Sequence, residues 1–166
     1  MEIAKALHFM RSKQFDKAIE TLKSYEKKDQ TLVAHAATNL SFIYFHEADY
    51  PNAIKYADLA MKHNRYNAKA LVNKGNCMFM RGDLEHARAM YQQAMGEEAD
   101  CLEAIYNLGV VNKRLGELPS ALGLFEKLHH RVAFVCPVHP SSTFIFAEQN
   151  LRVIILIDRY DSLVSG

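Results

Sequence analysis

The sequence predicts an all-α protein in which pairs of amphipathic helices repeat along the chain. Small residues recur at a fixed interval, and helix start and stop signals lie between them. The chain has 166 residues, of which 49% are hydrophobic and 23% are charged. This length and balance suit a folded domain with a core of its own, and they argue against a disordered chain.

Two columns of small residues mark the repeat. The first column is Ala18, Ala53, Ala87 and Ala121. The second is Ala6, Ser41, Gly75 and Gly109, and both columns have spacings of 35, 34 and 34. An ordinary helical bundle needs no fixed register, so two columns in step predict a repeat array. We expect them to let neighbouring helices and neighbouring repeats approach closely, while a large residue four positions after each alanine fills the space between repeats.

Turn signals divide the chain into eight expected helices. Gly82 and Gly116 stand where helices should end, and Pro51 and Pro119 stand in first helical turns. The expected helices cover about residues 2–12, 15–27, 32–46, 50–63, 68–80, 84–95, 102–114 and 118–130.

A period of 34 residues with these marks is typical of the tetratricopeptide repeat (TPR). Its A-x3-F element is present as Ala87…Tyr91 and Ala121…Phe125 and more weakly as Ala18…Leu22, whereas Ala57 occupies the large position of the second repeat. The leading tryptophan is absent throughout. We therefore predict a TPR solenoid of four helix-turn-helix repeats, at about 1–30, 34–65, 68–99 and 102–130, within an array that covers residues 1–130.

The segment 131–166 carries no repeat marks. It contains a turn sequence around Pro137 and Pro140 and a strand-prone apolar run at 153–157. We expect an irregular tail that either caps the fourth repeat or is poorly ordered.

A second pattern in this region could suggest a metal site. His129, His130, Cys136 and His139 are all residue types that bind zinc. Their spacing matches no known zinc module, and we interpret them instead as surface residues near a helix end. A small metal-binding regulator therefore remains a minor alternative, and we expect neither a metal site nor a cofactor.

No catalytic motif accompanies the repeats. The sequence has no phosphate-binding loop and no nucleophile elbow, and its acidic residues are spread along helices instead of converging in pairs. We predict that the protein is not an enzyme.

Charge and cysteine content restrict the partners and the compartment. A net charge of +1 gives no general basic field, so we expect no nucleic-acid partner. The longest apolar run, 153–157, is too short to span a membrane. Three cysteines, too few and odd in number for a disulfide framework, indicate a reducing intracellular compartment.

The repeat register also predicts a partner-binding groove along the first helix of each repeat. Its expected lining is Thr38, Phe42, Phe45, Val72, Asn76, Phe79, Tyr106, Val110 and Lys113, preceded by Ile3, Leu7 and Met10 in the first repeat. Apolar surface of this kind often binds an amphipathic helix or an extended segment, although any one of these side chains could instead pack between helices. Ile3 and Leu7 occupy the places where chaperone-tail clamps use Lys and Asn, which argues against a clamp for a C-terminal carboxylate.

Several strings give the chain a closer resemblance. They are 4–13 with Phe15, 36–41, 64–67, 73–76, 103–109 and 125–129. In this order they resemble polaris-like TPR subunits of the intraflagellar transport B complex, over residues 1 to about 129. The resemblance implies a scaffold in cilium assembly and transport, at the cilium and ciliary base, with other transport subunits as partners.

That family has further repeats on both sides of this region, so we expect a partial chain that leaves the family pattern after His129. A general TPR adaptor of another assembly, such as the anaphase-promoting machinery, is the main alternative.

Overall fold

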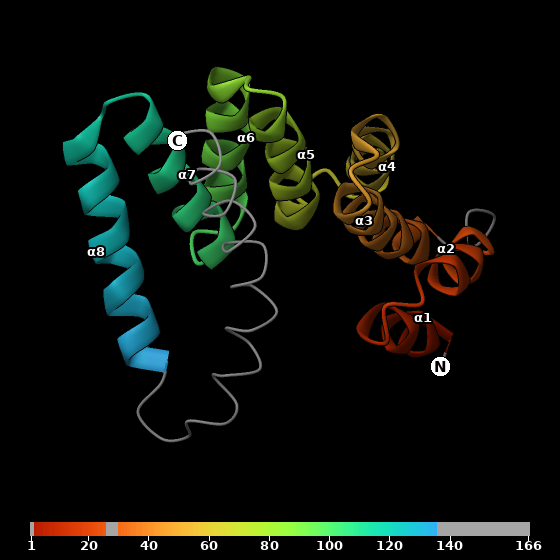
Figure 1. Cartoon of the computed structure of the whole chain (residues 1–166). Helices are drawn as coiled ribbons and strands as arrows, with labels where there is room; N and C mark the ends of the chain where they lie inside the picture. Colours follow the sequence, from red (N-terminus) through yellow and green to blue (C-terminus); the bar gives the residue numbers. More distant parts are fainter. Residues whose placement is uncertain (1, 26–29, 136–166) are drawn as a thin grey trace. The chain divides into compact units, whose positions relative to one another are not determined.

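The computed structural model describes residues 2–25 and 30–135, and these residues form eight α-helices and no strand (Figure 1). The helices are α1 (Glu2–Arg11), α2 (Phe15–Lys23), α3 (Gln30–His46), α4 (Tyr50–His63), α5 (Ala68–Met80), α6 (Leu84–Glu97), α7 (Leu102–Arg114) and α8 (Leu118–Val135). The eight predicted helices are thereby confirmed. The largest differences are that α2 ends at Lys23 instead of 27 and that α8 continues to Val135 instead of ending at 130. The features expected at 136–166 lie outside the described residues.

Three helices begin at side-chain caps. The side-chain oxygens of Asp49, Asn67 and Asp83 each accept the backbone N–H three residues later, at 3.1 to 3.3 Å. Such a bond satisfies one of the N–H groups left without a partner in a first helical turn. The starts of α4, α5 and α6 are therefore encoded locally, in the residue that precedes each helix.

One turn geometry closes every hairpin. Lys13, Ala48, Gly82 and Gly116 all have left-handed backbones, with φ of 56°, 59°, 80° and 83°. In each turn the next residue donates its N–H to the carbonyl five positions back, as Asp83 does to Met78 at 3.0 Å. This is the helix-ending motif that glycine favours, yet the first two hairpins form it with residues that carry a Cβ.

The chain divides into two compact units, Met1–Ala104 and Ile105–Gly166. In the first unit successive helices pack against one another, and α3 also contacts α5. Its main core joins Leu22 of α2 with Leu40 and Ile43 of α3. The second unit contains most of α7 together with α8, and there Tyr106 packs on Phe125 with ring centroids 5.8 Å apart.

The structure buries all eight residues of the two small-residue columns. A Cβ added to Gly75 would lie 2.6 Å from Cε1 of Tyr91, and one added to Gly109 would lie 2.7 Å from Cε1 of Phe125. Tyr91 and Phe125 thus lie against the glycine of their own hairpin, where the missing side chain leaves room for a ring. Leu22, at the same repeat position, packs with Leu40 and Ile43 of the following hairpin, as expected of a residue between repeats.

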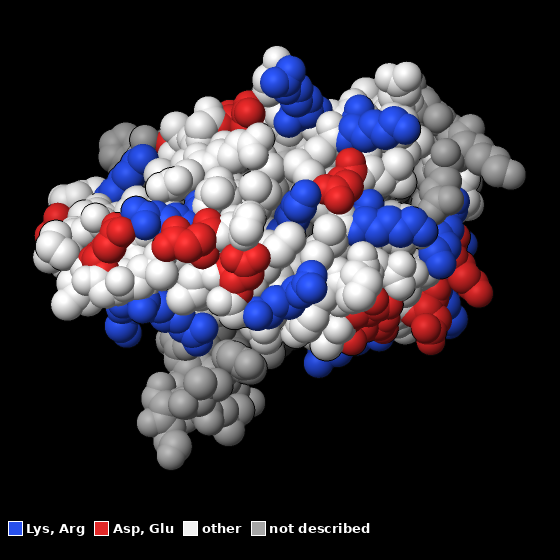
Figure 2. Space-filling view, turned by 90° about the horizontal axis from the view of Figure 1, so that it is seen from above, with Lys and Arg blue, Asp and Glu red and all other residues white. Residues whose placement is uncertain are grey.

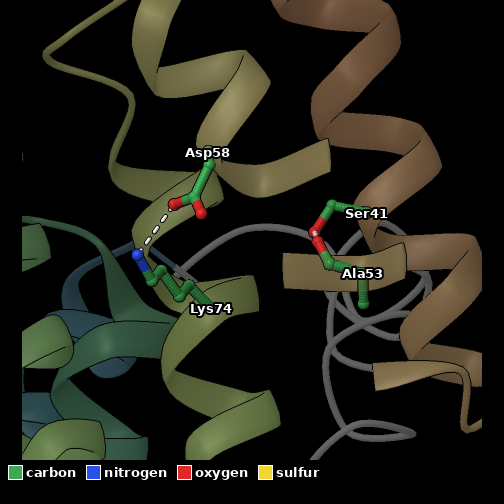
Figure 3. A network of polar contacts seen from close by, with 4 residues as sticks. All are labelled: Ser41, Ala53, Asp58 and Lys74. Carbon is green, nitrogen blue, oxygen red and sulfur yellow. Dashed lines mark hydrogen bonds and ion pairs between the residues drawn. The ribbon is translucent and has the colours of Figure 1, made fainter. Parts of the chain in front are cut away.

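The second hairpin makes this contact differently. Its small residue is Ser41, whose hydroxyl donates to the carbonyl of Ala53 at 2.8 Å (Figure 3 labels both residues). Sixteen residues after Ser41 stands Ala57, where the first, third and fourth hairpins have Leu22, Tyr91 and Phe125. The second hairpin therefore lacks a large residue at this position and joins α3 to α4 there by a hydrogen bond.

Candidate partner-binding surface

The nine predicted groove residues differ in how far their side chains are buried. Those in the first unit lie on α3 and α5, and Tyr106, Val110 and Lys113 lie on α7 in the second. The buried members are Phe45, Val72, Asn76, Phe79 and Val110. Thr38, Phe42 and Tyr106 are partly exposed, and Lys113 is exposed. The buried members offer little side-chain surface to a partner, so the binding hypothesis now concerns mainly the other four.

Asn76 illustrates this division. It is 3% exposed, and its side-chain oxygen accepts a hydrogen bond from the Tyr91 hydroxyl at 2.7 Å. Burial raises the pKa of Tyr91 well above its usual value, because an unsolvated phenolate is unfavourable. Asn76 thus provides a polar partner for a phenol deep in the fold, a structural role that the sequence analysis did not foresee.

Thr38 connects three segments by hydrogen bonds. Its hydroxyl donates to the carbonyl of Ala34 and accepts from the side-chain amide of Asn67, both at 2.8 Å. Its own carbonyl accepts from the Asn73 side chain at 3.1 Å. Asn67 therefore caps α5 with its oxygen and binds α3 with its nitrogen. The position of Asn67 directly before a helix could have identified the cap, but not the bond to Thr38.

Phe42 belongs to an exposed aromatic group that we call the α3 aromatic patch: Phe15, Phe42 and His46. The ring centroids of Phe42 and His46 are 6.2 Å apart with an edge-on geometry, and those of Phe15 and His46 are 5.5 Å apart. His46 is exposed, and both phenylalanines are partly exposed. Phe15 and His46 are not among the predicted groove residues. The four-residue spacing from Phe42 could have indicated His46, whereas Phe15 comes from the preceding hairpin.

Charged residues border this patch without belonging to α3: Asp16 and Lys17 follow Phe15, Glu47 follows His46, and all three are exposed. The α3 helix contains no Asp, Glu, Lys or Arg. On α5, the Nζ of Lys74 lies 2.7 Å from a carboxylate oxygen of Asp58 on α4, as Figure 3 shows. On the face seen in Figure 2, both signs of charge are interspersed with uncharged surface. The patch itself is therefore aromatic, with charges of both signs at its edge.

The two cysteines within the described residues show no chemical activation. Cys77 and Cys101 are buried, and burial raises the pKa of their thiols to about 12 and about 11. A thiol with such a pKa is protonated at neutral pH and is a poor nucleophile or metal ligand.

Among the described residues, no group of three or more His, Cys, Asp or Glu side chains is arranged to hold a metal ion. Of the tail residues considered for zinc, His130 is exposed on α8, while Cys136 and His139 lie outside the described residues. That hypothesis stays untested. Within the same described part of the chain, no helix combines the length and apolar character needed to cross a membrane.

Comparison with known proteins now decides the fold. A family model described as tetratricopeptide repeat matches residues 79–131. The crystal structure of MamA superposes with a TM-score of 0.66 at 22% identity, covering 75% of this chain and 72% of that one. The fold is a TPR helical solenoid. TPR domains act as scaffolds that bind other proteins.

Other TPR structures are similar to a comparable degree. The first TPR of Spaghetti (RPAP3), solved with the HSP90 peptide SRMEEVD, gives a TM-score of 0.62 at 24% identity and covers 68% of this chain and 89% of that one. The TPR2B domain of yeast Sti1, in complex with pHsp70, gives a TM-score of 0.61 at 19% identity and covers 74% of this chain and 93% of that one. At these identities the similarity concerns the fold alone.

A curated human protein shows a closer sequence match. The chain is 45% identical over 67 residues to the intraflagellar transport protein 88 homolog of Homo sapiens. The match covers 40% of this chain but 8% of that relative, so the chain spans only a small part of the relative's length.

Proposed function

We propose that this chain is a non-catalytic scaffold of intraflagellar transport, which acts in cilium assembly at the cilium and ciliary base. The observation that carries the proposal is the 45% identity over 67 residues with the human intraflagellar transport protein 88 homolog. A TPR fold agrees with this role because TPR domains are scaffolds that bind other proteins. The proposed partners are other subunits of the same transport machinery.

The α3 aromatic patch is the proposed contact surface in the first unit. Partly exposed aromatic side chains are enriched among residues that dominate binding energy, because they bury a large area with little loss of side-chain freedom. Thr38, one helical turn before Phe42, is partly exposed, but its hydroxyl is already bonded to Ala34 and Asn67, so we assign it a structural role. In the second unit, Tyr106 and Lys113 are the corresponding candidates on α7.

A pull-down from ciliated cells tests this function. The full chain should capture intraflagellar transport subunits, and Phe42→Ala should reduce that capture several-fold, since truncation of a central aromatic contact commonly costs about 2 kcal/mol of binding energy. Tyr66→Ala is the matched control because Tyr66 is 70% exposed and lies outside the patch. Circular dichroism melting of both variants checks that the fold is retained.

Three outcomes would count against the proposal. Capture of subunits from a different assembly would favour a general TPR adaptor instead. Capture of no partner would reject the scaffold role in these cells. Equal capture by wild-type protein and Phe42→Ala would remove the patch from the binding surface.

A further inference from the structure

Two leucines on α8 are far more exposed than their counterparts in earlier hairpins. Leu118 is 62% exposed and Leu122 is 59% exposed, one turn apart on the same helix face. The same positions hold Phe15 and Ile19 on α2, Tyr50 and Ile54 on α4, and Leu84 and Arg88 on α6, at the repeat spacings of 35, 34 and 34. All six of these residues are partly buried.

In the first two hairpins, the first helix of the following hairpin covers these positions. Phe15 and Ile19 pack against the core cluster that includes Ile43 of α3, and Phe15 also contacts the ring of His46. Tyr50 and Ile54 pack in one cluster with Cys77 and Met80 of α5. The covering helix therefore presents two residues spaced by three, at 43 and 46 or at 77 and 80.

A charged contact accompanies the apolar one between α4 and α5. Asp58 of α4 pairs with Lys74 of α5 at 2.7 Å (Figure 3). Two repeats later, at spacings of 34, the position of Asp58 is occupied by Glu126 on α8, which is exposed. The face of α8 thus repeats both parts of the α4 surface that binds α5: an apolar pair and a carboxylate one to two turns further along.

We propose that Leu118, Leu122 and Glu126 form a second docking surface, which binds an amphipathic helix of a partner protein. The bound helix carries a Lys or Arg followed by apolar residues three and six positions later, as Lys74, Cys77 and Met80 do on α5. Burial of the two leucines supplies most of the affinity, and the carboxylate fixes the register of the bound helix. This surface is built from other residues than the α3 aromatic patch and does not depend on the proposed function.

The N-terminal helix of a second copy fits this surface less well. Its matching residues are Lys5, His8 and Arg11 on α1. Lys5 would satisfy Glu126, but His8 and Arg11 would bring polar and charged groups onto the leucines, where loss of hydration is unfavourable. A partner helix with apolar residues at both positions avoids this cost.

Binding of two probe peptides to the full chain tests the surface. The first probe has the sequence of α5, residues 68–80, and the second has that of α1, residues 2–11. We expect fluorescence anisotropy to detect binding of the α5 peptide and much weaker binding of the α1 peptide. Leu118→Gln with Leu122→Gln should weaken α5-peptide binding at least tenfold, whereas Tyr66→Gln should leave it unchanged. The proposal would be overturned if the full chain did not bind the α5 peptide. It would also be overturned if the double leucine variant bound this peptide as tightly as the Tyr66→Gln variant does.

A charge exchange separates specific docking from general hydrophobic adhesion. Glu126→Lys should weaken binding of the α5 peptide by about fivefold, the effect of an ion pair worth about 1 kcal/mol. A peptide carrying Lys74→Glu should restore binding to that variant. Failure of the exchange to restore affinity would reject the proposed register.

Photo-crosslinking from position 122 identifies the occupant. A benzoylphenylalanine at this position should crosslink to the α5 peptide, and one at position 66 should not. Crosslinks to residues 131–166 of the same chain would show that its own C-terminal segment fills the surface. Crosslinks between two copies would show self-association. Either of these results would overturn the proposal of a partner helix.

Discussion

At the scale of single residues, the contact between a glycine and an aromatic ring distinguishes the third and fourth hairpins from the first two. Gly75 and Gly109 leave space that Tyr91 and Phe125 occupy. At the same two positions the first hairpin has Ala6 and Leu22, and the second has Ser41 and Ala57. The second hairpin, which lacks a large residue there, joins its helices by a hydrogen bond from the Ser41 hydroxyl to the Ala53 carbonyl.

Substitution of Gly75 by alanine tests this contact. The added Cβ would lie 2.6 Å from the Tyr91 ring, which is held by the bond from its hydroxyl to Asn76 and cannot easily move away. We expect Gly75→Ala to lower the free energy of unfolding by about 1–3 kcal/mol, as measured by urea denaturation.

Gly96→Ala is the matched control, because a Cβ at Gly96 of α6 meets nothing within 4 Å. Alanine there should be neutral or stabilise the protein by about 0.5–1 kcal/mol. A Gly75→Ala variant as stable as Gly96→Ala would mean that Tyr91 adapts freely.

At the scale of elements, the turns that end the first helix of each hairpin share one geometry but not one residue type. Gly82 and Gly116 adopt the left-handed backbone without a Cβ, whereas Lys13 and Ala48 adopt it against the preference of an L-residue. The hydrogen bonds of the motif form in all four hairpins. The packing of each hairpin, and not the turn residue alone, must therefore impose the turn.

One substitution can remove the strain of the left-handed backbone at Ala48. Ala48→Gly should raise the free energy of unfolding by about 0.5–1 kcal/mol, because release of left-handed strain exceeds the added freedom of the unfolded chain. Thermal and urea unfolding measure the gain. Ala89→Gly on the exposed side of α6 makes the same chemical change inside a helix and should destabilise the protein by about 1 kcal/mol.

The cap of α6 should respond to acid. The hydrogen bond from the His86 side chain is the main cause that lowers the pKa of Asp83 below its ordinary value of 3.8. A carboxyl whose pKa is lower in the folded state stabilises the fold above the ordinary pKa, and that contribution is lost as the pH falls through the folded value.

We therefore expect Asp83→Asn, which keeps a capping oxygen, to reduce the loss of melting temperature between about pH 5 and pH 2. An identical acid response in wild-type protein and variant would show that this cap contributes nothing to pH dependence. His86→Gln offers a second comparison, since it removes the imidazole that lowers the pKa of Asp83.

At the scale of the whole molecule, the buried thiols should report opening of the first unit. Cys77 and Cys101 are buried, and their pKa values of about 12 and about 11 leave little thiolate at pH 8. Alkylation followed by peptide mass spectrometry should find both thiols protected in the native protein and reactive in urea. Rapid labelling of Cys77 without denaturant would contradict the packing of α5.

Much of the fold could be predicted from the sequence, because repeated residues make repeated contacts. The positions of Ala18, Ala53 and Ala87 gave the register, and the turn signals gave helix bounds close to those of the structure. The end of α2 and the continuation of α8 were missed because no strong stop signal stands at either place.

The candidate site was harder to predict than the fold. Periodicity identifies the residues on one side of a helix, but it does not reveal which of these residues another helix covers. Asn76 has the correct register for a groove, yet it is buried with Tyr91. Phe15 and His46 come from different hairpins, so their proximity depends on tertiary packing. The exposure of Leu118 became informative only after its counterparts proved to be covered.

The two bonds of the Asn67 side chain have a consequence for cooperativity. Its oxygen initiates α5, and its nitrogen reaches back to Thr38 in the preceding hairpin. If α5 frays at its first turn, the protein loses one of the hydrogen bonds between two repeats together with the helix start. Local melting and separation of the hairpins are thus coupled through one amide, which helps adjacent repeats to unfold as a single unit instead of independently.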